Sequence, residues 1–262
     1  MRCYGLRAAL CAAALCAALL AGASFWLGLT GAAAVSALLV ALGWISYFHA
    51  ERKVLAALRA RPVSEVERPE LYRLVRELSR AARLPVPQMY VSPAAQPNVL
   101  TVGYSARSAA VCCTEGLLGL LSPAELRAVL AHEVAHIARR DVAVASLSAG
   151  VALLLPFWTL IALLQHVTAP AGREYDADID GALLTGDPEA LASALRKIDA
   201  GTAGAVPLRP RGPLAAASGL MIACPFPPGG LGGRLGSHPP VGERVRRLEV
   251  LSGGREAGLN GR

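Results

Sequence analysis

The chain has 262 residues, of which 54% are hydrophobic and only 17% charged, and its formal net charge is +7. This apolar excess is typical of a membrane protein with a soluble portion rather than of a wholly soluble domain. The positive charges form no repeated stripe with interleaved aromatic residues, so the sequence does not favour nucleic acid as a partner. Attraction to the anionic headgroups of a lipid bilayer accounts for the charge more simply.

The first apolar block, residues 8–48, contains no charged residue and is about twice as long as the ~20 residues that one helical membrane span needs. Small residues interrupt the block at positions 28–31. We therefore predict a transmembrane helical hairpin over residues 1–50. One domain is then expected over residues 51–252, followed by a flexible tail at 253–262.

Basic residues flank both ends of the apolar block: Arg2 and Arg7 precede it, and Arg52 and Lys53 follow it. By the positive-inside rule, both ends of the hairpin and the domain that follows lie in the cytoplasm. The alternative is a cleaved signal peptide, but the second half of the block would still leave a membrane anchor.

The domain after the hairpin is predicted to be mostly helical with a small β-meander, which is an α+β fold. Apolar residues recur at helical spacing over residues 68–84, and short strand-like runs separated by turn residues follow. Gly and Pro residues at 201–236 predict a long surface loop. The predicted strands are residues 88–92, 98–104 and 108–114, and later helices are expected from residues 122, 187 and 241.

The helix in "SPAELRAVLAHEVAHIARRDV" has a clear start, because Ser122 can cap it and Glu125 completes a capping box. Its middle carries His132, Glu133 and His136 within an apolar pattern. Residues four apart share a helix face, so the two histidines can hold one metal ion from the same side. Glu133 then lies beside the open position of the metal, where it can take a proton from a metal-activated water. The alternative is a pair of hydrogen-bonded histidines without a metal.

A third ligand is needed to decide between these interpretations, and "REYDADIDGALLTGDPEAL" offers one. Glu174 and Asp178 are four apart on one helical face. Glu174 can complete a His, His, Glu ligand set, while Asp178 can orient a ligating imidazole. Alone, this acidic run would be read as a solvated helix face. Together with HExxH, it predicts a site for one Zn²⁺ ion per chain.

Three stretches, "AVLAHEVAHIARRDV", "REYDADIDGALLTGDPEALASALRKI" and "SHPPVGERVRRLEVL", together resemble the HtpX family of membrane-bound zinc endopeptidases. This family is related to the CAAX prenyl proteases and to the gluzincins. The resemblance implies that His132, His136 and Glu174 are zinc ligands. It also implies that Glu133 is the catalytic base and that Asp178 supports the site.

The resemblance extends to two further motifs. Asn98 lies in a stretch similar to the family's substrate strand, and His238 and Arg244 lie in a His-Pro-Pro-x-x-x-Arg motif. A cation or imidazole there can stabilise the oxyanion of a tetrahedral intermediate. For His238 this role and a structural role stay open, whereas for Arg244 we favour a structural role.

The strand that begins at Asn98 suggests how an extended substrate binds. A peptide can add to a free sheet edge through main-chain hydrogen bonds, which gives affinity without strict sequence choice. The candidate substrate-binding residues are Asn98, Val99, Leu100 and Thr101.

The apolar segment 142–168 departs from the family, whose members have two membrane spans between HExxH and the third ligand. Its 27 residues are too few for two spans, which need about forty. One span would place Glu174 across the membrane from His132. We therefore expect a re-entrant, interfacial or buried segment that returns to the side it left.

These inferences predict a zinc endopeptidase of the bacterial inner membrane, multi-pass, with its active site facing the cytoplasm. Its expected partners are misfolded or membrane protein substrates and the lipid bilayer, as implied by the resemblance to a protein quality-control and stress-response protease. The alternative is a non-catalytic zinc-binding scaffold or chaperone-like relative, although the retained Glu133 argues against it.

Overall fold

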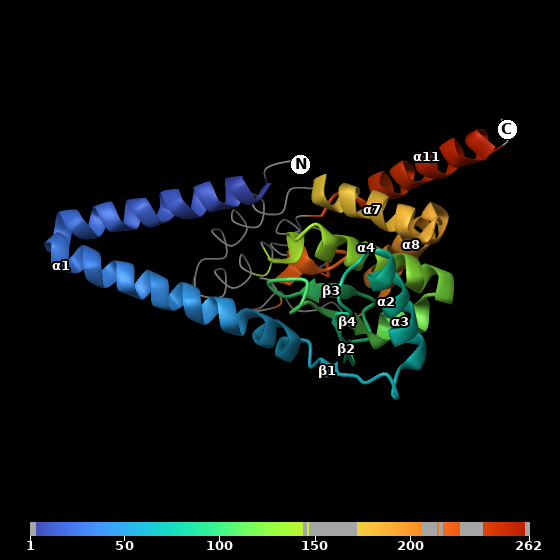
Figure 1. Cartoon of the computed structure of the whole chain (residues 1–262), viewed down its shortest axis with the longest axis horizontal. Helices are drawn as coiled ribbons and strands as arrows, with labels where there is room; N and C mark the ends of the chain where they lie inside the picture. Colours follow the sequence, from blue (N-terminus) through green and yellow to red (C-terminus); the bar gives the residue numbers. More distant parts are fainter. Residues whose placement is uncertain are drawn as a thin grey trace.

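The computed structural model describes residues 4–143, 146, 172–205, 214, 217–225 and 238–259. Its first element, α1 (Tyr4–Ala57), bends at Gly28, where φ is 67° and ψ is −167°. Positive φ is readily available only to glycine, so the break falls within the stretch of small residues that predicted it. Figure 1 shows the two arms of α1 folded back toward each other beside the rest of the molecule.

Among the described residues, no helix has both the length and the hydropathy required to cross a bilayer. The transmembrane character of the hairpin therefore stays a prediction. Most of the apolar segment 142–168 lies outside the described residues, as does much of the predicted loop 201–236.

Four short strands form one mixed sheet with the order β1-β2-β4-β3. Strand β2 runs parallel to β4, while β3 is antiparallel to β4 and β1 is antiparallel to β2. The strands are β1 (Arg61–Pro62), β2 (Gln88–Ser92), β3 (Val99–Val102) and β4 (Ala110–Thr114).

The predicted β-meander is therefore wrong, because β4 lies between the consecutive strands β2 and β3. A meander needs a turn directly after β2, but the chain there continues across the helix α3 (Glu115–Leu120) instead. The N–H of Gly116 donates to the carbonyl of Ala94, and a Cβ at Gly116 would lie only 2.0 Å from the carbonyl oxygen of Ala95. This close passage carries the chain to the far side of β4, where β3 forms the edge of the sheet.

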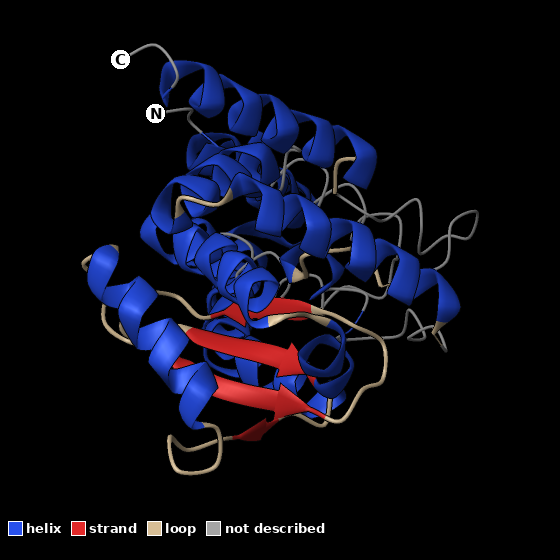
Figure 2. Ribbon diagram, turned by 90° about the vertical axis from the view of Figure 1, so that its right-hand side faces the viewer, coloured by secondary structure: helices blue, strands red, loops and turns tan. Residues whose placement is uncertain are grey.

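Helices cover the sheet, as Figure 2 shows, and the sequence predicted most of them. The last helix continues to Leu259 instead of ending near residue 251, so residues 253–259 are helical and not the expected tail. Similarly, α8 includes the first residues of the predicted loop 201–236. The described helices after α1 are α2 (Pro69–Ala81), α3 (Glu115–Leu120), α4 (Pro123–Ala138), α7 (Gly172–Thr185), α8 (Pro188–Gly204), the 3-10 turn η1 (Ser218–Leu220) and α11 (Val241–Leu259).

The two faces of the sheet are buried in different apolar clusters, because successive strand residues point to opposite sides. Val99 faces the larger cluster, which α2, α4 and α8 complete. Leu100 and Val102 face a smaller cluster that includes Val54 and Leu58 from the end of α1. β3 is thus buried on both faces and is in contact with α4.

Candidate metal centre

Helix α4 holds the HExxH residues in the interior of the domain. The predicted capping box is present, since the Ser122 hydroxyl accepts from the Glu125 N–H and the Glu125 carboxylate accepts from the Ser122 N–H. Burial tends to raise the pKa of Glu125, but hydrogen bonds from Lys197, Ser193 and Ser122 lower it to about 2.

Within α4, His132 and Glu133 are almost fully buried and His136 is 8% exposed. An isolated polar side chain is costly to bury, so these groups need partners.

Helix α7 packs closely against α4 and supplies carboxylates that lie near the two histidines. Glu174, Asp178 and Gly181 are spaced by four and three residues, so they share one face of α7. A Cβ at Gly181 would lie 2.9 Å from both the Cα and the N of His132, which is closer than real Cβ atoms approach. Glycine at this position therefore lets α7 come near enough to place Glu174 opposite the histidines.

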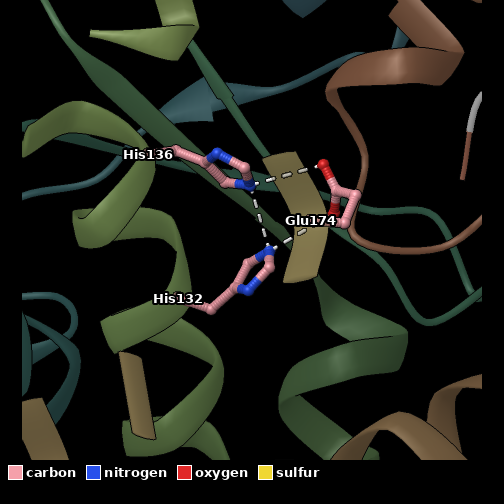
Figure 3. Close-up of side chains that lie close together, drawn as sticks. All are labelled: His132, His136 and Glu174. Carbon is pink, nitrogen blue, oxygen red and sulfur yellow. Dashed lines mark hydrogen bonds and ion pairs between the residues drawn. The ribbon is translucent and has the colours of Figure 1, made fainter. Parts of the chain in front are cut away.

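The three predicted ligands converge on one point (Figure 3). The Nε2 atoms of His132 and His136 are 3.1 Å apart. Glu174 Oε2 is 3.6 Å from the first nitrogen, and Oε1 is 3.5 Å from the second. Ligands about 2.0–2.1 Å from a tetrahedral zinc ion lie about 3.3 Å from one another, so this triangle fits such an ion. Glu174 Oε2 is buried and has no hydrogen-bond partner, as expected of an atom directed at a cation.

A carboxylate lies beside the outer nitrogen of each histidine. Asp178 Oδ1 is 3.0 Å from His132 Nδ1, although the geometry of this contact is not that of a hydrogen bond, and Asp141 Oδ2 is 3.4 Å from His136 Nδ1. Such contacts fix the orientation of a ligating imidazole and raise its basicity. Asp141 was not among the residues predicted from the sequence, although its position five residues after His136, just past the end of α4, was a usable signal.

The carboxylates and imidazoles of the site shift one another's pKa values. Burial lowers the pKa of His136, but Glu174 and Asp141 together raise it to about 9. For Glu174, burial raises the pKa, while His136, His132 and His238 hold it well below its usual range. Binding of a metal ion to His136 at neutral pH therefore requires that this imidazole lose its proton.

The predicted base, Glu133, lies in the same small cavity, of about 10 Å³, as the three ligands. Its Oε2 accepts a 2.5 Å hydrogen bond from the hydroxyl of Thr101 on β3. Thr101 had been predicted only as part of a substrate strand. Its side chain instead orients the carboxylate of Glu133.

Arg244 is fully buried and lies beside Asp178. Its guanidinium donates two hydrogen bonds to Asp178, of 2.8 and 2.7 Å, and one of 2.7 Å to the carbonyl of Ile222. Burial lowers the pKa of Arg244, but Asp178 and Glu174 raise it by more than this. The net pKa is above the usual value, so the side chain stays charged. This placement fits the structural role favoured from the sequence.

His238, for which an oxyanion-stabilising role and a structural role both stay open from the sequence, also lies at the site. Its Nδ1 is 3.6 Å from Glu174 Oε2, and its Nε2 donates to the carbonyl of Ser218 across 2.9 Å.

The predicted substrate strand is at the sheet edge, but the chain's own residues occupy part of that edge. The N–H of Ile222 donates to the carbonyl of Val99, and Leu100 forms an antiparallel bridge with Met221. The Asn98 amide donates to the carbonyl of Ala223. Residues 219–221 also line the metal cavity, so this segment covers the place where a paired substrate would lie.

Known proteins are similar to this chain over most of its length. The model of peptidase family M48 matches residues 65–252. A protein named Protease HtpX homolog from Kineococcus radiotolerans is 44% identical over an alignment of 243 residues, and the match covers 80% of this chain and 82% of that protein. This chain is a member of the HtpX family of M48 peptidases. Proteins of the same name from an Arthrobacter species and from Bifidobacterium longum are 44% and 36% identical, covering 79% and 87% of this chain and 81% and 86% of theirs.

Family membership confirms the resemblance seen in the sequence motifs. It identifies the chain as a metalloprotease and implies a divalent metal, for which the structure provides a buried His, His, Glu cluster.

Proposed function

We propose that this HtpX family member is a zinc-dependent endopeptidase that hydrolyses peptide bonds in misfolded or membrane proteins. The observation that carries the proposal is the buried triangle of His132, His136 and Glu174, with Glu133 in the same cavity. Two imidazoles and one carboxylate suit Zn²⁺, and three protein ligands leave a fourth position open for catalysis.

The side chains of the site have different roles in the proposed reaction. A zinc ion bound by the triangle would supply Lewis-acid activation of water and of the substrate carbonyl. Glu133 accepts the proton of the attacking water and passes it to the leaving amine. Thr101 orients Glu133 by its hydrogen bond, while Asp178 and Asp141 orient the two imidazoles.

The substrate is proposed to pair with β3 in an extended conformation, at Asn98, Val99, Leu100 and Thr101. Because residues 220–222 occupy this edge, substrate binding requires their displacement. Moving this segment also frees Nε2 of His238 from the Ser218 carbonyl. We propose that the freed N–H then donates to the oxyanion of the tetrahedral intermediate.

We further propose that α1 anchors the enzyme in the bacterial inner membrane as a two-span hairpin, with the active site facing the cytoplasm. The uncharged block 8–48, the bend at Gly28 and the basic residues at both ends support this topology. Entry and exit of segment 142–168 on one side of the membrane would keep Glu174 beside His132.

The test compares wild-type protein with Glu133→Gln, both purified in detergent and loaded with zinc. Glu70→Gln, an exposed change on α2, serves as a matched control. We expect wild type and the control to cleave an unfolded protein substrate, and Glu133→Gln to bind one zinc per chain without cleaving. Equal activity in all three proteins, or activity in none, would contradict the proposal.

A further inference from the structure

A second cavity, of about 390 Å³, adjoins the metal centre. Val142 lines both cavities. On the β3 side, the lining changes from Thr101 in the metal cavity to Tyr104 in the second one. On the α4 side, it changes from His136 to Ile137 and to Arg140, which lies just past the end of the helix. Both walls therefore advance in the same direction, and the second cavity continues the first.

The offset between the cavities matches the spacing of an extended peptide. Three residues of extended chain, the separation between Thr101 and Tyr104, cover at most about 10 Å. A peptide that crosses the metal centre therefore reaches the second cavity with the side chain two or three residues from the cleaved bond. Met221 bridges β3 in the antiparallel sense. A substrate in the same orientation has its amino-terminal side toward Tyr104.

The lining of the second cavity is apolar at its base and cationic at its rim. Ala109, Ile137 and Val142 are buried apolar residues. Arg107 and Arg140 are exposed, and no acidic side chain lines the part of this cavity that the structure describes. A side chain that fits has an apolar stem and a terminal carboxylate, as glutamate has.

We propose that this cavity is a substrate subsite that prefers an acidic side chain two or three residues on the amino-terminal side of the cleaved bond. The inference rests on the proposed endopeptidase function and adds a specificity to it. Arg107 and Arg140 are the residues that determine this preference, through charge-assisted hydrogen bonds to the substrate carboxylate.

The experiment uses the full-length zinc-loaded enzyme and a set of peptides in which glutamate or glutamine is placed at each position around the cleaved bond. We expect kcat/KM to be about fivefold to tenfold higher for glutamate than for glutamine at the second or third position only, as expected of partly exposed ion pairs. The preference should decline in about 1 M NaCl, because salt screens exposed charges.

The variants Arg107→Gln and Arg140→Gln should each lower this glutamate-to-glutamine ratio by about twofold to fivefold. Arg83→Gln is the matched control, because Arg83 is also an exposed arginine after a helix end with positive φ, 57° against 59° for Arg140. This control should retain the wild-type ratio.

Failure of the subsite proposal and failure of the proposed function would give different results. If no peptide and no unfolded protein is cleaved, the proposed function fails. If peptides are cleaved without a glutamate preference, or with one that both arginine changes and salt leave intact, the subsite fails alone. Peptide cleavage is also measured with and without vesicles that contain phosphatidylglycerol. If the vesicles activate the wild-type enzyme, and the arginine changes abolish this activation but leave the ratio intact, the cavity binds lipid headgroups and the proposal is overturned.

Discussion

Substitution of Gly181 by alanine tests whether the approach of α7 to α4 sets the geometry of the metal centre. The added Cβ would lie 2.9 Å from the backbone of His132, whereas ordinary contact begins at 3.4 Å. The two helices must therefore separate locally by about 0.5 Å. Metal–ligand distances tolerate only about 0.2 Å, so a shift of this size disturbs the triangle that Glu174 completes.

The magnitudes favour an effect on metal binding over an effect on folding. Overpacking costs about 1–3 kcal/mol, but alanine recovers about 1 kcal/mol of helix propensity relative to glycine. We therefore expect Gly181→Ala to lower the free energy of unfolding by at most about 2 kcal/mol. Its zinc affinity should fall by about 10-fold to 100-fold, the range seen when the supports of ligating residues are disturbed.

The assay measures zinc affinity by competition with a chelator, and stability by urea unfolding of the metal-free protein. Gly242→Ala on α11 is the control, because nothing lies within 4 Å of its added Cβ. That variant should bind zinc as wild type does. Wild-type zinc affinity in Gly181→Ala would refute the reasoning, since α7 would then hold Glu174 in place without this close contact.

Three further predictions concern the surroundings of the ligands. Thr101→Val removes the hydrogen bond to Glu133 and should lower kcat by about tenfold or more at unchanged zinc content; unchanged kcat would contradict the orienting role. Zinc affinity should rise by about tenfold per pH unit between pH 6 and 8, because His136, with its pKa raised to about 9, must lose a proton to bind metal; a flat profile by chelator competition would contradict this. Glu125 has a folded pKa of about 2 against 4.5, so its stabilising contribution is complete above pH 4.5 and is lost as the pH falls toward 2. Urea unfolding should therefore show Glu125→Gln less stable than wild type at pH 6 and closer to it at pH 3, and an equal gap at both would argue against the shift.

The sequence predicted those parts of the site that local rules determine. The capping box of α4 and the i, i+4 spacing of His132 and His136 depend on residues within one helix, and both are present. Glu174 and Asp178 could be paired with them because their spacing also places them on one helical face. Helical periodicity therefore indicated most of the metal centre.

Contacts between distant elements could not be predicted in the same way. The hydrogen bond from Thr101 to Glu133 joins β3 to α4, and it depends on which strand forms the sheet edge. Strand propensity gave the positions of β2, β3 and β4 but not their order, because the crossing near Gly116 is a tertiary feature. The hydrogen bond from Ile222 to the sheet edge at Val99 could not be predicted either, because composition alone indicated a loop around Ile222.

The end of α1 gives the catalytic domain a boundary different from the one that the family match suggests. The M48 match begins at residue 65, yet Val54, Leu55 and Leu58 cover the same sheet face as Leu100 and Val102. A truncated protein that starts at residue 65 would expose this face and lose β1 as well. To obtain a correctly folded domain, the cut should be made upstream of Val54, which retains the last turns of α1 as part of the hydrophobic core.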